Sequence, residues 1–282
     1  MRTEAAGLGT ACLVVALLAA ATHPATAQSR DVILGTTTSV RDAGLLDVLL
    51  PPFERRSGYT VKVIAVGSGQ AMELGRRGEA DVLLLHDPAG EERFVADGYG
   101  VARHALMHNE FVLVGPAVDP AAVRGLDVIT AFRRMAAAGT RFVSRGDRSG
   151  THVKELALWA RAGRTPSEAW YRETGQGMGA TLVVASEFAA YTLTDVATFL
   201  AHRLPPALEI LVQGDSILRN PYHVIRANPD RFPHINTTGA TALADYLLSP
   251  ETQRVIGEFR RAELGRAIFV PDGTTVGDGR AR

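Results

Sequence analysis

The sequence predicts an α/β protein in which a mainly parallel sheet is flanked by helices. From Asp31 onward, short apolar or β-branched segments alternate with helix-like segments, which is the pattern of strand–helix–strand units. Of the 282 residues 46% are hydrophobic and 21% are charged, so the chain can build a sizeable core. The length suits one large domain or two lobes of medium size, and no internal repeat interrupts it.

The first series of elements covers residues 32–96. An apolar strand is expected over 32–34, followed by a helix over 43–55, which the pair Pro51-Pro52 should break or restart. A β-branched strand ends at Gly67. The remaining expected elements are a helix over 71–77, a strand over 81–85 and a helix over 88–96.

A second series begins with a strand that runs into Gly115-Pro116. Its alternation of apolar runs and helical periodicity resembles that of the first series, so the same fold class is expected. The expected strands cover 111–114, 141–143, 209–212 and 222–225, and the expected helices cover 128–138, 151–162, 180–190, 195–202, 238–248 and 250–259.

The N-terminus has the pattern of a secretory signal peptide, residues 1–27. Arg2 precedes an apolar stretch over 8–21, and the small-residue pattern of 25–27 predicts cleavage near Ala27. An uncleaved membrane anchor is the alternative interpretation, although the apolar run is short for a span of about 20 residues. The single cysteine, Cys12, would be removed with the leader. We therefore expect a periplasmic protein without disulfides.

Charge and histidine spacing argue against several classes of partner. The 30 basic and 30 acidic residues cancel, so no basic field attracts nucleic acid. None of the eight histidines falls in an HExxH arrangement, so neither a metal nor a cofactor is expected. His86-Asp87 and His152 are interpreted as capping or surface groups.

Three strand–loop–helix segments share one construction and form the strongest local signal. Glycine and hydroxyl residues follow a strand and precede a helix at 35–39, 67–70 and 144–151. Backbone N–H groups at the start of a helix lack intrahelical partners and favour an anion. Hydroxyls add donors without charge. Good helix capping is the simpler explanation for any one loop, and the recurrence favours an anion site.

The third loop adds a permanent positive charge, Arg145. A buried anion needs compensation, and the planar guanidinium can donate to two of its oxygens. Arg145 could instead pair with Asp147 or lie at the surface. If Asp147 pairs with Arg145 or caps a helix, no carboxylate is free to accept the proton of hydrogen phosphate, and phosphate should bind poorly.

The motifs resemble those of the substrate-binding proteins of bacterial tungstate ABC transporters, which have the type II periplasmic binding-protein fold. The matching stretches are 36–39 with 42–46, 63–71, 144–147 with 149–151, 191–195 and 220–222, in the order expected for that family. One departure is that Val196-Ala197 follows Asp195, where the family usually has Arg-Gly. Any contact of the missing arginine is in doubt.

The resemblance implies two lobes around a ligand cleft, each lobe a mainly parallel sheet flanked by helices. Lobe I would hold residues 28–110 and 217–282, and lobe II would hold 111–216, with crossings near 109–115 and 217–225. The implied ligand contacts are Thr37, Thr38, Ser39, Ser68, Arg145, Ser149, Gly150, Thr151 and, more weakly, Thr192.

The function implied is capture of tungstate by lobe closure and delivery to an inner-membrane permease, by a monomer that is not an enzyme. Molybdate or another tetrahedral oxyanion is the alternative ligand. Two other classes stay open: an exported serine hydrolase using Ser68 or Ser149, and a cytoplasmic sensor domain, for which no helix-turn-helix precedes Asp31.

Overall fold

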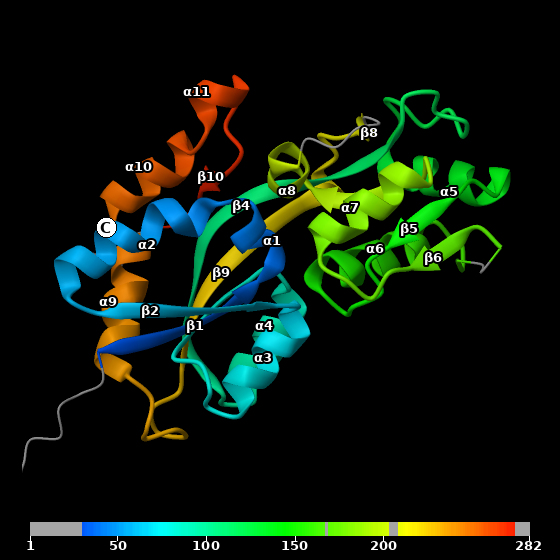
Figure 1. Ribbon diagram of the computed structural model, residues 1–282. Coiled ribbons are helices and arrows are strands. Elements are labelled where there is room, and N and C mark those ends of the chain that lie inside the picture. Colours follow the sequence, from blue (N-terminus) through cyan, green and yellow to red (C-terminus); the bar gives the residue numbers. More distant parts are fainter. Residues whose placement is uncertain (1–29, 167–168, 203–207, 274–282) are drawn as a thin grey trace, which may run out of the picture.

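Two long strands run through the middle of the molecule and join two α/β halves (Figure 1). They are β4 (Gly100–Pro116) and β9 (Arg219–Ala227), which pair antiparallel and are called the hinge strands below. The computed structural model describes residues 30–166, 169–202 and 208–273. The predicted signal peptide, residues 1–27, therefore lies outside the described part. No helix within those ranges is long and apolar enough to cross a membrane.

The first half contains the parallel strands β1 (Asp31–Thr37), β2 (Thr60–Val66) and β3 (Val82–Leu85). The strand order is β10-β4-β9-β3-β1-β2, with β10 (Val270–Pro271) at the edge. β3 is buried on both faces, as expected for a central strand in an α/β fold. The helices of this half are α1 (Thr38–Asp42), α2 (Leu45–Ser57), α3 (Ser68–Arg76), α4 (Pro88–Ala96), α9 (Thr237–Leu248), α10 (Pro250–Glu258) and α11 (Arg261–Leu264).

The second half is built around the distal part of β4. There β4 pairs with β7 (Thr192–Asp195) and β8 (Leu208–Val212), while β5 (Phe142–Ser144) pairs with β6 (Tyr171–Glu173). A single bridge between Phe142 and Tyr191 links these two sheets. Its helices are α5 (Val128–Ala138), α6 (Gly150–Arg161), α7 (Met178–Glu187), α8 (Val196–Ala201) and the 3₁₀ turn η1 (Ser216–Leu218).

The α/β class and the helix-flanked sheets are confirmed, but the sheet is mixed and not mainly parallel. Parallel pairing joins β1 to β2 and β3, and β5 to β6. The pairs formed by β4 and β9 are antiparallel. The reason is that the chain crosses between the halves in both directions, so each half receives one strand that opposes its βαβ units.

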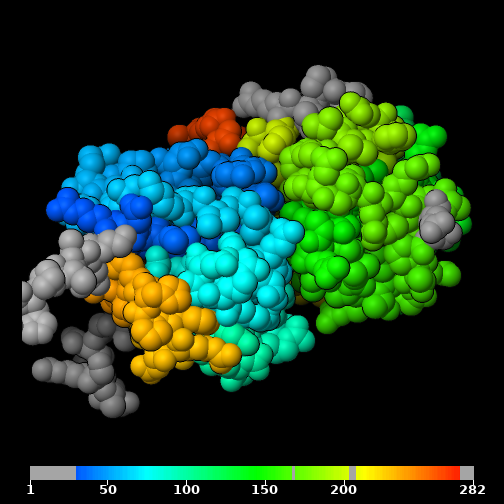
Figure 2. Space-filling model, turned by 60° about the horizontal axis from the view of Figure 1, so that its bottom comes forward, coloured from blue at the N-terminus to red at the C-terminus, as the bar shows by residue number. Residues whose placement is uncertain are grey.

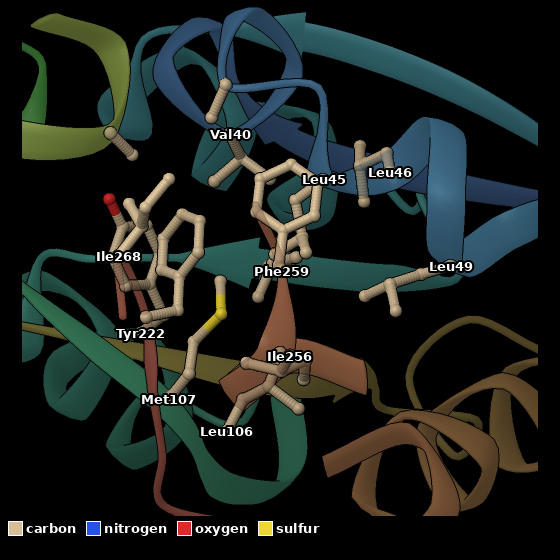
Figure 3. Close-up of a cluster of buried hydrophobic side chains, with 14 of the residues drawn as sticks. Val40, Leu45, Leu46, Leu49, Leu106, Met107, Tyr222, Ile256, Phe259 and Ile268 are labelled. Atoms are coloured by element: carbon tan, nitrogen blue, oxygen red, sulfur yellow. The ribbon is translucent and has the colours of Figure 1, made fainter. Parts of the chain in front are cut away.

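The expected break at Pro51-Pro52 is wrong, because α2 continues through both prolines. An interior proline costs a helix about 3 kcal/mol. Five apolar side chains of α2 are buried, and each contributes about 1.5–3 kcal/mol, so packing outweighs the loss. Leu45, Leu46 and Leu49 of this helix lie in the cluster drawn in Figure 3, opposite side chains from β4 and the C-terminal segment.

Replacement of Leu49 by alanine should test this packing. Leu49 is 1% exposed, and Leu49→Ala should lower the free energy of unfolding by about 2–5 kcal/mol. The preceding residue, Val48, is 45% exposed, so Val48→Ala should change it by less than about 0.5 kcal/mol. Urea denaturation of both variants measures the difference, and equal losses would contradict the assigned face of α2.

Candidate functional site

The ends of several strands meet at one edge between the two halves. The parallel register of β1 and β2 pairs Thr37 with Val66, so the loops that follow lie side by side. β3 lies on the other side of β1 and leads into His86. Such a carboxyl edge is where open α/β sheets bind ligands.

The third loop reaches this edge from the second half. The backbone N–H of Gly150, the first residue of α6, donates to Ser68 Oγ at 3.2 Å. Arg145 Nη2 donates to Thr38 Oγ1 at 3.3 Å. The three loops with the shared construction are therefore in mutual contact, and Figure 2 shows the blue-to-cyan part of the first half in direct contact with the green second half.

Arg145 is the charged centre of the site. Its side chain is buried, with the residue 2% exposed, and Nη2 also donates to Asp147 Oδ2 at 2.5 Å. Within the described ranges, Nε and Nη1 of Arg145 and the Thr151 hydroxyl are buried without a hydrogen-bond partner. Unpaired buried donors on a cation are costly, so this arrangement suits an anion that would accept from them.

Asp147 resolves the alternatives left open for Arg145. Its carboxylate accepts from Arg145 and, through Oδ1, from the backbone N–H of Ser149 at 3.1 Å. Arg145 therefore pairs with Asp147 and is buried at the same time. Both carboxylate oxygens are engaged with donors, which limits what Asp147 can accept from a ligand.

The structure brings eight of the nine sequence-predicted site residues together and leaves Thr192 apart. Thr37 and Ser39 lie with their hydroxyls 3.2 Å apart, and Ser149 accepts from the N–H of His152 to cap α6. Thr192 begins β7 opposite Val114, whereas the carboxyl end of that strand, Asp195, lies at the site edge. Three residues of strand separate them by about 10 Å.

His86 and Asn220 belong to the site and were missed by sequence reasoning. The interpretation of His86 as a capping or surface group is wrong, because the ring is 3% exposed and lies 3.4 Å from Ser39 Oγ. Burial lowers the pKa of His86 to about 4, so the ring is neutral at physiological pH. Asp87 does cap α4, accepting from Gly90. The position of His86 directly after a buried strand was the available signal.

His152, also interpreted as a capping or surface group, is 7% exposed. Its Nδ1 accepts from the backbone N–H of Arg148 at 3.1 Å, which braces the loop before α6. The surface interpretation is therefore wrong for this ring as well, because the first turn of α6 is packed between the halves.

A buried carboxyl group, Glu155 of α6, lies next to the third loop. Its Oε1 accepts from Trp159 Nε1 at 3.2 Å and from the Tyr171 hydroxyl at 2.7 Å. Burial raises its pKa to about 7, opposed by hydrogen bonds that include one from Ser144, the residue before Arg145.

In the described ranges no group of three or more His, Cys, Asp or Glu side chains could hold a metal ion.

Comparison with known proteins agrees with this architecture. A family model described as a PBP superfamily domain matches residues 20–251. A curated protein named tungstate-binding protein TupA, from Peptoclostridium acidaminophilum, is 46% identical over 244 residues, which cover 86% of this chain and 85% of that protein.

Two solved structures are similar in both sequence and fold. One is described as the tungstate ABC transporter from Geobacter sulfurreducens, with 47% identity and a TM-score of 0.75 over 81% of this chain and 98% of that one. The other is the tungstate-binding protein TupA from Desulfovibrio alaskensis G20, with 43% identity and a TM-score of 0.73 over 86% and 99% of the two chains.

The chain belongs to the periplasmic-binding-protein (PBP) superfamily. Within that superfamily, it falls in the family that contains the proteins named TupA.

The pKa of Glu155 predicts a pH-dependent stability. The folded protein keeps this proton up to about pH 7, whereas the unfolded chain loses it near 4.5. The contribution of the Glu155 carboxyl to the free energy of unfolding is therefore complete below pH 4.5, and it is lost as the pH rises through about 7.

Relative to Glu155→Gln, the wild type should lose up to about 3 kcal/mol of unfolding free energy between about pH 5 and about pH 8. Urea denaturation of both proteins at the two pH values measures this difference. Parallel pH dependences in the two proteins would show that Glu155 is ionised in the fold.

Proposed function

We propose that this protein is the extracytoplasmic substrate-binding component of an ABC transporter, and that it captures tungstate and delivers it to a permease in the inner membrane. The observation that carries the proposal is the set of buried, unpartnered donors on Arg145 and Thr151 at the meeting point of the loops. Relatives named as tungstate-binding proteins support the choice of ligand.

Capture works by binding, and no bond of the ligand is made or broken. The oxyanion exchanges its hydration shell for fixed donors, which are already oriented and need little reorganisation. Because loops of both halves contact the same region, one ion stabilises the closed arrangement. The permease would recognise that closed form. The proposed lobes are 28–110 with 217–282, and 111–216. One hydrophobic cluster is drawn from residues 111–218, slightly past that boundary, and another combines side chains of both lobes.

The proposed ligand contacts come from both halves. Arg145 supplies charge and two nitrogens, Nε and Nη1, that have no hydrogen-bond partner in the described part of the chain, and the start of α6 supplies Ser149, Gly150 and Thr151. The first half supplies Ser68 and the loop of Thr37, Thr38 and Ser39. Thr192 lies at the far end of β7 and is left out of the proposed set.

Ligand choice would depend on proton content and size. A fully deprotonated dianion such as tungstate or molybdate needs only donors, whereas hydrogen phosphate also needs an acceptor. Asp147 is engaged by Arg145 and Ser149, so it is a poor acceptor for a further proton. Sulfate is smaller than tungstate and would leave donors unfilled. Molybdate is nearly the same size and remains the alternative ligand.

A serine hydrolase is not favoured by the geometry. Ser68 and Ser149 each accept from a backbone N–H, and it is Ser39 that contacts a histidine ring. The lowered pKa of His86 makes that ring a weak general base. The proposed protein is a periplasmic monomer, released by cleavage near Ala27, that does not bind nucleic acid.

Removal of Arg145 should nearly abolish binding. Arg145→Ala should reduce tungstate affinity by about 3 kcal/mol, roughly 100-fold, because it leaves the anion buried without its countercharge. Arg148→Ala removes the same charge from an exposed position three residues away and should change affinity less than about threefold. Isothermal titration calorimetry of both variants decides, and a loss under about tenfold for Arg145→Ala would remove that residue from the site.

A panel of oxyanions tests the ligand class on the wild-type protein. Calorimetry with tungstate, molybdate, sulfate and phosphate should show binding of the first two and poor binding of phosphate, because the pocket offers donors. Micromolar phosphate binding would defeat the proton-content argument.

A further inference from the structure

A row of buried polar side chains connects the hinge strands to the oxyanion site. Asn109 Nδ2 donates to Asp195 Oδ1 at 3.3 Å, and Asn220 Nδ2 donates to Asn109 Oδ1 at 2.8 Å. Asn220 Oδ1 lies 2.9 Å from His86 Nδ1, and His86 Nε2 lies 3.4 Å from Ser39 Oγ. All five residues are at most 3% exposed, and we call this row the relay.

Asp195 fixes the direction of every hydrogen bond in the relay. Burial raises the pKa of Asp195. In its ionised form the carboxylate can only accept, and it already accepts from the backbone N–H and the hydroxyl of Thr198 at 2.9 and 2.6 Å. Asn109 must therefore turn its NH₂ toward Asp195 and its oxygen toward Asn220. By the same argument, Asn220 must turn its NH₂ toward the oxygen of Asn109. The second N–H of Asn220 donates to the Tyr222 hydroxyl at 2.9 Å. Its oxygen is left facing His86.

That oxygen sets the tautomer of His86. Because Asn220 Oδ1 can only accept, the neutral ring carries its proton on Nδ1 and presents an unprotonated Nε2 to Ser39. Ser39 must then donate its hydroxyl hydrogen to the ring. Thr37, whose hydroxyl lies 3.2 Å from that of Ser39, completes the chain as a donor to Ser39.

We propose that Asn109, Asn220 and His86 act as positioning residues that fix the hydroxyl hydrogen of Ser39 on His86, so that Nε2 of the ring is not available to the ligand as an acceptor. This inference rests on the proposed oxyanion-binding function and names how its selectivity is built. Asp147 Oδ1 and His86 Nε2 are each engaged by a donor of the protein, the N–H of Ser149 and the hydroxyl of Ser39.

The relay also defines which hydroxyls of the pocket face the ion. Thr38 accepts from Arg145 and Ser68 accepts from the N–H of Gly150, so the hydrogen of each is free to donate. The hydrogens of Ser39 and Thr37 are committed to the relay. Thr38 and Ser68 are therefore the hydroxyl donors of the first half, and the nearby side chains of Thr37 and Ser39 shape the pocket.

The ring of His86 contacts the second half, so the relay depends on how the two halves are closed. A Cβ added to Gly150 would lie 2.9 Å from the His86 ring, so the ring packs directly against the first turn of α6. Asn109 and Asn220 are register partners on the hinge strands. The relay thus passes from the second half, through the hinge, to the loop of the first half.

The tautomer of His86 is a direct test that does not depend on any ligand. Imidazole ¹⁵N NMR of the wild-type protein should show a neutral ring protonated on Nδ1 at neutral pH, unlike free histidine, which favours Nε2. A ring protonated on Nε2, or on both nitrogens, would reverse the relay and overturn the proposal. Because no tungstate is needed, this result stands even if the proposed function fails.

Selectivity supplies the second test. Ser39→Ala removes the partner of Nε2 and exposes an acceptor, so the affinity ratio of phosphate to tungstate should rise at least about tenfold, by the energy of one hydrogen bond to a charged ligand. In a His86→Phe background no acceptor remains to be exposed, and Ser39→Ala should change the ratio less than about twofold.

These measurements distinguish failure of the relay from failure of the proposed function. An equal change of the ratio in both backgrounds, or no rise in Ser39→Ala, would overturn the relay. Absence of tungstate binding to the wild type would instead defeat the proposed function. If His86→Phe does not fold, the tautomer measurement decides alone.

Discussion

A buried guanidinium with unpaired N–H groups is the constraint on which the rest of the site depends. Arg145 cannot lose its proton, so its charge stays in the interior and needs a partner. Asp147 supplies one, but it occupies only Nη2. Nε and Nη1 stay available beside Thr151, at the boundary of the two halves. A ligand with several acceptor oxygens and negative charge answers that requirement.

The topology explains why one ion can satisfy groups from such distant parts of the sequence. Strands β1, β2 and β3 deliver three loops to one edge because they are parallel neighbours. The antiparallel hinge strands carry the chain to the second half and back, and they bring β5 and α6 to the same edge. Hydrogen bonds between Ser68 and Gly150, and between Thr38 and Arg145, then join the halves.

Sequence reasoning predicted the fold class and picked out the loops that the structure brings together, because both are encoded locally. Strand, loop and helix signals lie within short windows, so the loops at Thr38, Ser68 and Arg145 could be recognised. The course of α2 through Pro51-Pro52 could not, because tertiary burial overrides the local preference. His86 was misjudged for a related reason: its role depends on Asn220, which is 134 positions away. Thr192 was grouped with a motif whose other end, Asp195, reaches the site.

The central claim is that one dehydrated oxyanion sits among Arg145, Thr151 and the loops of both halves. A crystal of the protein grown with tungstate tests it most directly, since tungsten scatters X-rays anomalously and its position can be located without bias from the protein. The account predicts one strong peak, with oxygens in hydrogen-bonding contact with Arg145 Nε and Nη1, Thr151 and Ser68. A peak elsewhere on the molecule, or Arg145 turned to solvent with the ion bound, would contradict it.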